Sequence, residues 1–65
     1  MTINLEIRDK AHCIALAYFC KRVTFNDVYP CAHGDEAECK DMAYRILDGL
    51  SDIEKSLSEA GFNAR

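Results

Sequence analysis

The stretch from Ala11 to Cys20 contains only one polar side chain, His12, and it limits the possible folds more than any other feature. With the residues that flank it, this stretch forms two apolar stripes on different sides of one helix. The first stripe comprises Ile3, Ile7, Ala11, Ile14 and Tyr18, and the second comprises Cys13, Leu16, Phe19, Cys20 and Val23. A helix that is apolar nearly all round must be covered nearly all round. One further helix covers only one side, so the pattern predicts that a second subunit covers the other.

The sequence of the second half of the chain predicts one long helix, with signals for its first residue, its apolar face and its last residue. Asp35, with Glu38 three residues later, forms the pattern of a capping box. Apolar residues then recur in alternating steps of four and three, as in a heptad repeat. They are Cys39, Ala43, Ile46, Leu50, Ile53, Leu57 and Ala60. Gly61 and Phe62 follow in the pattern of a Schellman ending. Because Gly49 does not shift the phase of the repeat, we expect one helix over residues 36–60.

The remaining segments are less regular. Residues 2–8 alternate apolar and polar side chains, which is also typical of a half-buried strand. A lone strand would leave its edges unpaired, so we expect a helix over about residues 4–22 instead. Thr24 and Asp27 predict a short helical turn over about residues 24–29. We expect Pro30 to end this turn, because the residue before a proline is disfavoured in the α region.

Together these elements predict a single all-α domain over residues 1–65. The expected architecture is a two-helix antiparallel hairpin with a short connecting helical turn, which dimerises into a four-helix bundle. A chain of 65 residues buries only a thin core by itself, which also favours a partner subunit. We expect the interface to contain residues of both long helices, namely Ile14, Leu16, Tyr18, Phe19, Leu50, Ile53 and Leu57.

The net charge of −3 is divided unevenly along the chain. Residues 1–30 carry four Lys/Arg against three Asp/Glu, whereas residues 31–65 carry four against eight. Nucleic-acid affinity comes largely from cations that displace counterions, so direct nucleic-acid binding is disfavoured and a basic protein partner fits better. The sequence has neither a secretory signal nor an apolar stretch long enough to span a bilayer. We therefore expect a cytoplasmic protein that does not bind membranes.

Four cysteines allow three interpretations. In a reducing cytosol they are thiols or metal ligands rather than disulfides, and pairing Cys13 with Cys39 and Cys20 with Cys31 would need an oxidising compartment. Cys20, Cys31, His33 and Cys39 could together supply a zinc site, but closely spaced cysteine pairs, typical of structural zinc, do not occur. Reduced core cysteine is the better interpretation, and we expect no cofactor. A small zinc-binding module that contacts nucleic acid or a transcription complex is the alternative.

The sequence offers no set of catalytic groups. It has no glycine-rich phosphate loop and no nucleophile placed with an acid and a base. His12 and Cys13 are adjacent, and adjacent residues on a helix do not face each other. So short a chain also has little volume in which to build a pocket. We therefore expect that the protein is not an enzyme.

The whole chain resembles the very short early accessory proteins of lambda-like phages and phage inhibitors of host defence. The resemblance lies in its size, its mild acidity, its lack of a targeting segment, and a two-helix layout ending Glu59-Ala60-Gly61-Phe62. It implies a cytosolic helical protein that alters host or phage regulation through contacts. We therefore expect a small non-enzymatic regulatory protein that forms a homodimer and binds an unidentified host or phage protein.

Overall fold

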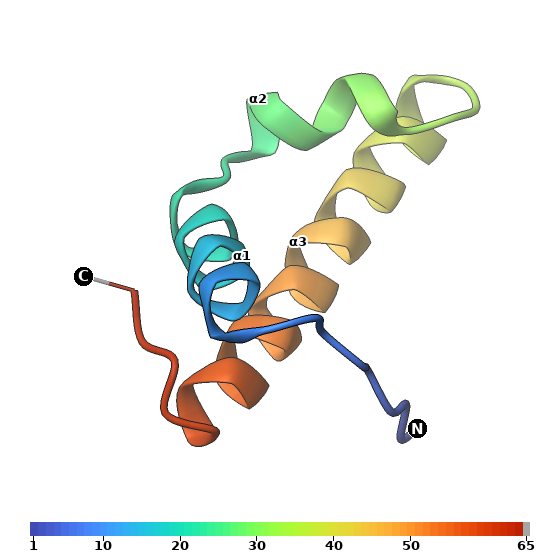
Figure 1. Ribbon diagram of the computed structural model, residues 1–65. Coiled ribbons are helices and arrows are strands. Elements are labelled where there is room, and N and C mark those ends of the chain that lie inside the picture. Colours follow the sequence, from blue (N-terminus) through green and yellow to red (C-terminus); the bar gives the residue numbers. More distant parts are fainter. Residues whose placement is uncertain (65) are drawn as a thin grey trace.

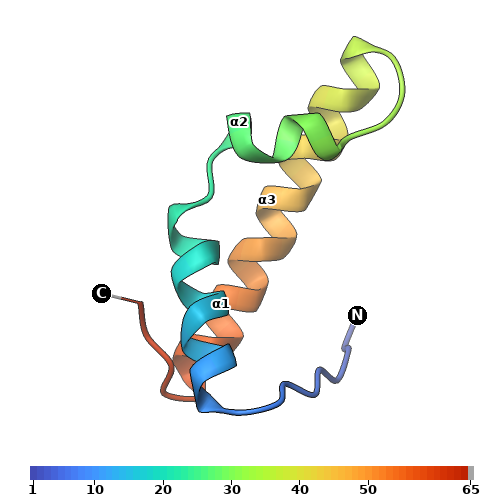
Figure 2. The same cartoon turned by 45° about the horizontal axis from the view of Figure 1, so that its top comes forward.

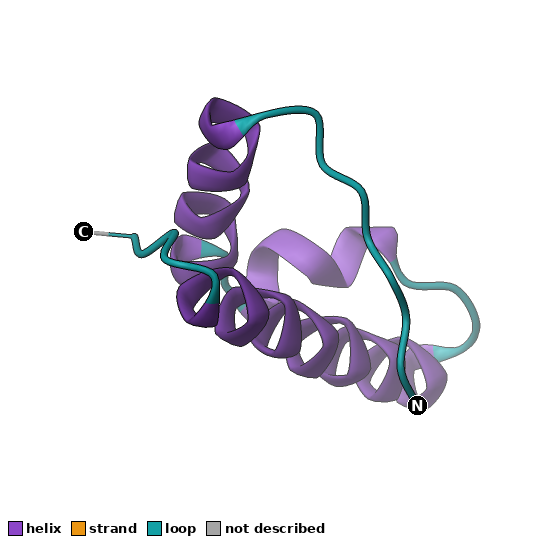
Figure 3. Cartoon of the chain, turned by 60° about the horizontal axis from the view of Figure 1, so that its bottom comes forward, coloured by secondary structure: helices purple, strands orange, loops and turns teal. Residues whose placement is uncertain are grey.

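The chain is all-helical, as predicted, in a computed structural model that describes residues 1–64 (Figure 1). Its elements are α1 (Lys10–Arg22), α2 (Phe25–Val28), a 3₁₀ turn η1 (Tyr29–Cys31) and α3 (Glu36–Glu59). No strand occurs among the described residues (Figure 3). The helix α1 lies across the C-terminal half of α3, while α2 and η1 lie against its N-terminal half (Figures 1 and 2). Every other element therefore packs on α3.

The first helix begins at Lys10 and not at about residue 4, so the predicted start was wrong. Asp9 has extended backbone angles, φ −162° and ψ 178°, and its Oδ1 accepts a hydrogen bond of 2.9 Å from the His12 amide. An N-cap of this kind satisfies a backbone amide that has no partner within the helix. The residues before Asp9 are not helical, so Ile3 and Ile7 do not extend the apolar stripe of α1.

The connection between α1 and α3 corrects a second expectation. Pro30 does not end the short helical turn, because it lies inside η1, and Tyr29 before it keeps helical angles of φ −54° and ψ −43°. A proline costs little in the first turn of a helical segment, where its missing N–H would have no partner. The Ala32 amide donates to the Tyr29 carbonyl at 3.1 Å and closes the turn.

Local interactions at both ends set the bounds of α3. At its start, the Glu38 amide donates to Asp35 Oδ1 at 2.9 Å, and the Asp35 amide donates to Glu38 Oε1 at 3.4 Å. At its end, the Phe62 amide donates to the Leu57 carbonyl at 2.8 Å, and Gly61 adopts φ +96°. A positive φ is strained for any residue with a Cβ, which explains the glycine. These bonds form a capping box and a Schellman motif, the two features expected from the sequence.

The core is built from small side chains. The buried residues are Cys13, Ala17, Cys20, Val28, Ala43 and Leu57. Cys13, Ala17 and Leu57 form its centre, where α1 crosses α3. Half-buried side chains pack around this centre, namely Ile7, Leu16, Ile53, Phe62 and Ala64. No large side chain among the described residues is completely enclosed, so the chain alone shields little apolar surface from water.

Candidate interaction surfaces

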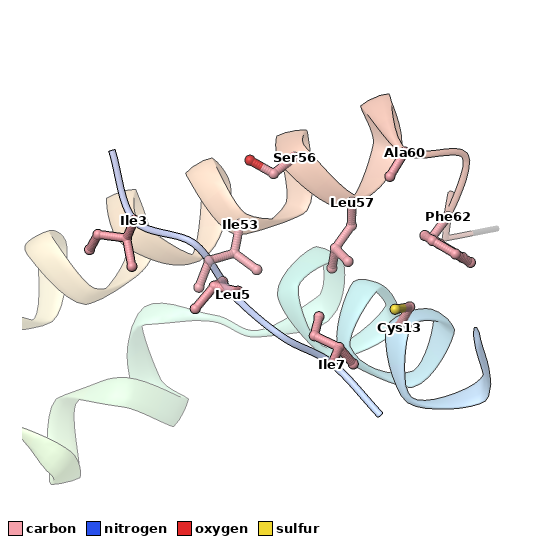
Figure 4. A pocket seen from close by; sticks show the side chains of 9 residues that line it. All are labelled: Ile3, Leu5, Ile7, Cys13, Ile53, Ser56, Leu57, Ala60 and Phe62. Atoms are coloured by element: carbon pink, nitrogen blue, oxygen red, sulfur yellow. The ribbon is translucent and has the colours of Figure 1, made fainter. Parts of the chain in front are cut away.

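Residues 1–9, called here the N-terminal segment, run from the start of α1 alongside α3 as a chain without helical structure (Figures 1 and 3). Ile3, Leu5 and Ile7 lie on the side that faces α3 (Figure 4). Successive side chains of an extended chain point to opposite sides, so the alternating sequence places the apolar residues together. The segment therefore has one apolar side and one polar side.

A cavity of about 320 Å³ lies between the N-terminal segment, α1 and the C-terminal end of α3 (Figure 4). It is lined by Ile3, Leu5, Ile7, Cys13, Ile53, Ser56, Leu57, Ala60 and Phe62. A second hollow shares Ile3, Leu5, Ile53 and Ser56 with it and continues past Gly49, Asp52 and Met1. We refer to the two hollows together as the N-terminal groove. Because the lining is mainly aliphatic, the groove suits apolar side chains.

The apolar side chains of the segment become more exposed with distance from α1. Ile7 packs against the core formed by Cys13, Ala17 and Leu57. Leu5 is 61% exposed and Ile3 is 68% exposed, although both lie along the groove. Isolated apolar side chains are common on protein surfaces, but a contiguous apolar patch marks a contact site. The N-terminal groove is therefore a candidate interaction surface.

A second apolar surface lies on the side of α1 that faces away from α3. Helical spacing places five residues there, which we call the outer face of α1: Ala11, Ile14, Ala15, Tyr18 and Phe19. Ile14 is 43% exposed and Phe19 is 53% exposed. At the end of this face the Arg22 guanidinium lies 4.6 Å from the centre of the Tyr18 ring, a cation–π contact.

The predicted interface residues divide into three groups in the structure. Leu57 is buried within the chain itself, and Leu16 and Ile53 pack against the core. Ile14 and Phe19 are exposed on the outer face of α1. The remaining two, Tyr18 and Leu50, are partly exposed. The fold thus brings three of the predicted residues together around its own core and leaves two exposed on the outer face of α1.

Ile3 and Leu5 were not predicted as surface residues, because the sequence pattern placed them in a helix. The signal was present, since alternation over residues 2–8 is typical of an extended chain. Tyr44 was also missed. It is 60% exposed, and its ring lies 5.0 Å from that of Phe25, which in turn lies 5.5 Å from Tyr29. Phe25 and Tyr29 are one helical turn apart, but no regular spacing links Tyr44 to them, so only the fold brings Tyr44 to this pair.

The four cysteines are separate thiols in the fold. Cys13 and Cys20 are buried, Cys39 is half-buried and Cys31 is exposed. Burial, together with the nearby carboxylate of Glu54, raises the pKa of the Cys20 thiol. Within residues 1–64, no three His, Cys, Asp or Glu side chains lie close enough together to hold a metal ion. The structure thus does not assemble the candidate zinc ligands Cys20, Cys31, His33 and Cys39.

The solvent side of α3 carries charged residues in pairs one helical turn apart. Arg45 Nε lies 2.9 Å from Asp41 Oδ2, and Lys40 Nζ lies 3.5 Å from Glu36 Oε1. Exposed pairs of this kind contribute little to stability. Over residues 1–64, none of the helices combines the length and the hydropathy needed to cross a bilayer.

The fold and its surfaces define a small all-helical protein with exposed apolar surfaces. The chain belongs to a family described as a family of unknown function, DUF7706, which it matches over residues 1–65. No curated protein and no solved structure matches it. The family description states neither an activity nor a source, so the resemblance to phage accessory proteins stays a prediction.

Proposed function

We propose that this protein is a small non-enzymatic binding protein, which forms a homodimer and regulates another protein through direct contacts. The single observation that carries the proposal is an excess of exposed surface. The folded chain exposes 5276 Å², whereas a compact monomer of 7.3 kDa exposes about 4,200 Å². The radius of gyration is 13.0 Å, against about 11 Å for a compact domain of this length.

The size of this excess fits a protein interface. It amounts to roughly 1,100 Å², and a stable interface covers about 800 Å² on each partner. The composition of the exposed surface fits as well, because five of its large apolar side chains belong to the two surfaces described above. These five are Met1, Ile3 and Leu5 of the N-terminal groove and Ile14 and Phe19 of the outer face of α1. A second subunit would shield apolar atoms that the chain leaves in water.

The proposal needs two contact surfaces, one for the second copy and one for the regulated protein. The N-terminal groove and the outer face of α1 supply two, and they are built from different parts of the chain. In this proposal the two long helices act as an antiparallel hairpin, and two copies form a four-helix bundle. The regulated protein is a host or phage protein, as the resemblance implies.

The chemistry of the groove supports binding rather than catalysis. The polar side chains that line it are the Ser56 hydroxyl, the Asp52 carboxylate and the buried Cys13 thiol, and among the described residues no hydrogen bond joins any two of them. General base catalysis needs a basic group within hydrogen-bond reach of the nucleophile. Four thiols also suit a reducing compartment such as the cytoplasm.

Sedimentation velocity across the micromolar range, with a reducing agent present, tests the proposal. We expect twice the mass of the chain at high concentration and dissociation on dilution. Phe19→Ser on the outer face of α1 and Leu5→Asp in the N-terminal groove identify which surface the second copy covers. At least one of them should weaken the dimer, while far-UV circular dichroism keeps its helical signal. A monomer at every concentration would contradict the proposal.

A further inference from the structure

We propose that residues 2–8 pair as an antiparallel β-strand with the same residues of a second copy, so that a two-stranded ribbon joins the two subunits. This inference rests on the proposed homodimer and names the segment through which it forms. It assigns the N-terminal groove to the second copy, so that the ribbon takes the place of a four-helix bundle as the contact between subunits, and it leaves the outer face of α1 for the regulated protein.

The backbone of this segment has no partners within the chain. Between residues 1 and 64, no backbone N–H or C=O group of residues 2–8 takes part in a hydrogen bond with another protein group. The segment lies along the outside of α3, so these groups are accessible (Figure 3). An extended chain with unpaired backbone groups and an apolar side is a template for strand pairing.

No other part of the described chain can supply the pairing strand. All elements between Lys10 and Glu59 are helices or short connections, and helical backbone is already bonded within itself. Residues 60–64 are only a short tail, in which the Phe62 amide is bonded to the Leu57 carbonyl and Phe62 and Ala64 pack against the core. A second copy carries the same unpaired segment. Symmetric dimers use the same patch on both subunits, and antiparallel pairing of one segment with itself has the required two-fold symmetry.

The side-chain pattern selects one register. With Leu5 opposite Leu5 of the second copy, Ile3 lies opposite Ile7 of the second copy, so each apolar residue of the segment meets an apolar residue. On the other side of the ribbon, Asn4 meets Glu6 of the second copy. A shift by two residues in one direction would place two Glu6 carboxylates directly opposite each other, which is unfavourable. A shift by two residues in the other direction would place Asn4 opposite Asn4 and leave Ile7 and Arg8 without partners within residues 2–8. A shift by one residue would turn apolar side chains to water.

The helices provide the support that such a ribbon needs. An isolated pair of strands is only marginally stable in water, and packing against a helix makes it stable. Ile3 and Leu5 line the same groove as Ile53 of α3, and Ile7 packs against the cluster that contains Leu57 (Figure 4). The apolar side of the ribbon would therefore rest on α3, and a second strand would cover what Ile3 and Leu5 still expose.

Cysteine cross-linking on the polar side of the ribbon tests this pairing without touching the groove. The background is Cys31→Ser, since Cys31 is the exposed thiol among the four. Asn4→Cys and Glu6→Cys chains are oxidised separately and as a mixture. We expect most of the linked dimer in the mixture, because these two positions are directly opposite, and opposed residues lie within reach of a disulfide. The control is Asp48→Cys in the same background, because Asp48 is exposed on α3 and outside the ribbon. It measures how much dimer is linked by random collision.

Leu5→Asp provides the second measurement, with Leu5→Val as its matched control. The aspartate removes a leucine from the apolar side of the ribbon in each subunit and places two carboxylates at the two-fold axis, so we expect the dissociation constant of the dimer to rise by about tenfold or more. Leu5→Val should leave it nearly unchanged. Helical circular dichroism serves as the folding check. The cross-linking result stands even where the aspartate variant fails to fold.

The outcomes separate this inference from the proposed function. A wild-type dimer, a mixture that links more than either chain alone, and weakening by Leu5→Asp support the ribbon. A wild-type dimer with no preference for the mixture and no response to Leu5→Asp overturns the ribbon and leaves the homodimer. A wild-type monomer at every concentration overturns both.

Discussion

Asp9 and His12 are joined by two contacts at the start of α1. Asp9 Oδ1 accepts a hydrogen bond from the His12 amide at 2.9 Å and lies 2.6 Å from His12 Nδ1. The carboxylate thus caps the helix and holds the imidazole. This pair fixes the point where the N-terminal segment gives way to helix, and with it the direction in which the segment leaves α1.

Asp9→Ala removes this cap, so we predict a loss of helical signal and a lower Tm. Loss of an N-cap typically shifts the Tm of a small domain by about 5 °C. Asp9→Asn is the matched control, because an asparagine side chain also accepts the bond from the His12 amide. Thermal melts followed by far-UV circular dichroism make the comparison. Equal Tm values for the alanine and asparagine variants would show that capping is not what the carboxylate contributes.

Acid should destabilise the fold through Asp9 and Asp27. Hydrogen bonds from the side chain and the amide of His12 lower the pKa of Asp9, and those from the amide and hydroxyl of Thr24 lower the pKa of Asp27. A lowered pKa gives a contribution that is fully present above the ordinary aspartate pKa of about 4 and is lost as pH falls through the lowered value. We predict that the Tm of the wild-type protein falls in this acid range and that the Tm of Asp9→Asn falls by a smaller amount. An equal acid dependence in both proteins would argue against the Asp9 contribution.

The same substitution should have opposite effects at two glycines. Gly49 lies inside α3, and a Cβ added there would meet only open space, so Gly49→Ala should stabilise the protein by about 1 kcal/mol. Gly61 has φ +96°, which is strained for a residue with a Cβ, although no atom lies within 4 Å of a Cβ added there. Gly61→Ala should therefore destabilise the protein by about 1–2 kcal/mol through backbone strain alone. Urea denaturation of both variants measures the difference. Two effects of the same sign would contradict the assigned end of α3.

Leu57 is the largest side chain in the core, and it should be the most sensitive position. Leu57→Ala leaves a cavity that α1 and α3 cannot fill, at a cost of roughly 2–5 kcal/mol, which is enough to unfold a domain of this size. Leu57→Met conserves volume and should cost less than about 1.5 kcal/mol. Chemical denaturation checks both values. An alanine variant as stable as the methionine variant would show that this core does not hold the fold together.

The cysteines should react in the order of their exposure. A short pulse of iodoacetamide followed by mass spectrometry should label Cys31 first and Cys39 next. Cys13 and Cys20 should react slowly, since they are buried and since the raised pKa of Cys20 leaves less of the reactive thiolate. In denaturant all four should react alike. Early labelling of Cys20 in the native protein would contradict its burial in the fold.

Local signals made α3 predictable, whereas α1 and the surfaces depended on the rest of the fold. The start of α3 at Asp35 and its end at Gly61 are set by residues within a few positions of each other. The start of α1 was missed because Ile3 and Ile7 fit both a helical and an alternating pattern. Asp9, a preferred N-cap residue directly after the alternation, was the signal that would have separated them. The burial of Leu57 could not be foreseen, because spacing along a helix does not say which molecule covers a stripe.

The contact between Cys13 and Leu57 has a consequence for how the chain acquires its structure. The two residues lie near opposite ends of the sequence, and Phe62 packs against the same cluster. During synthesis α1 leaves the ribosome long before the helix that must cover it. The side of α1 that packs on α3 stays in water until α3 and Phe62 have emerged. The nascent chain is therefore a natural client for chaperones until translation has passed the end of α3.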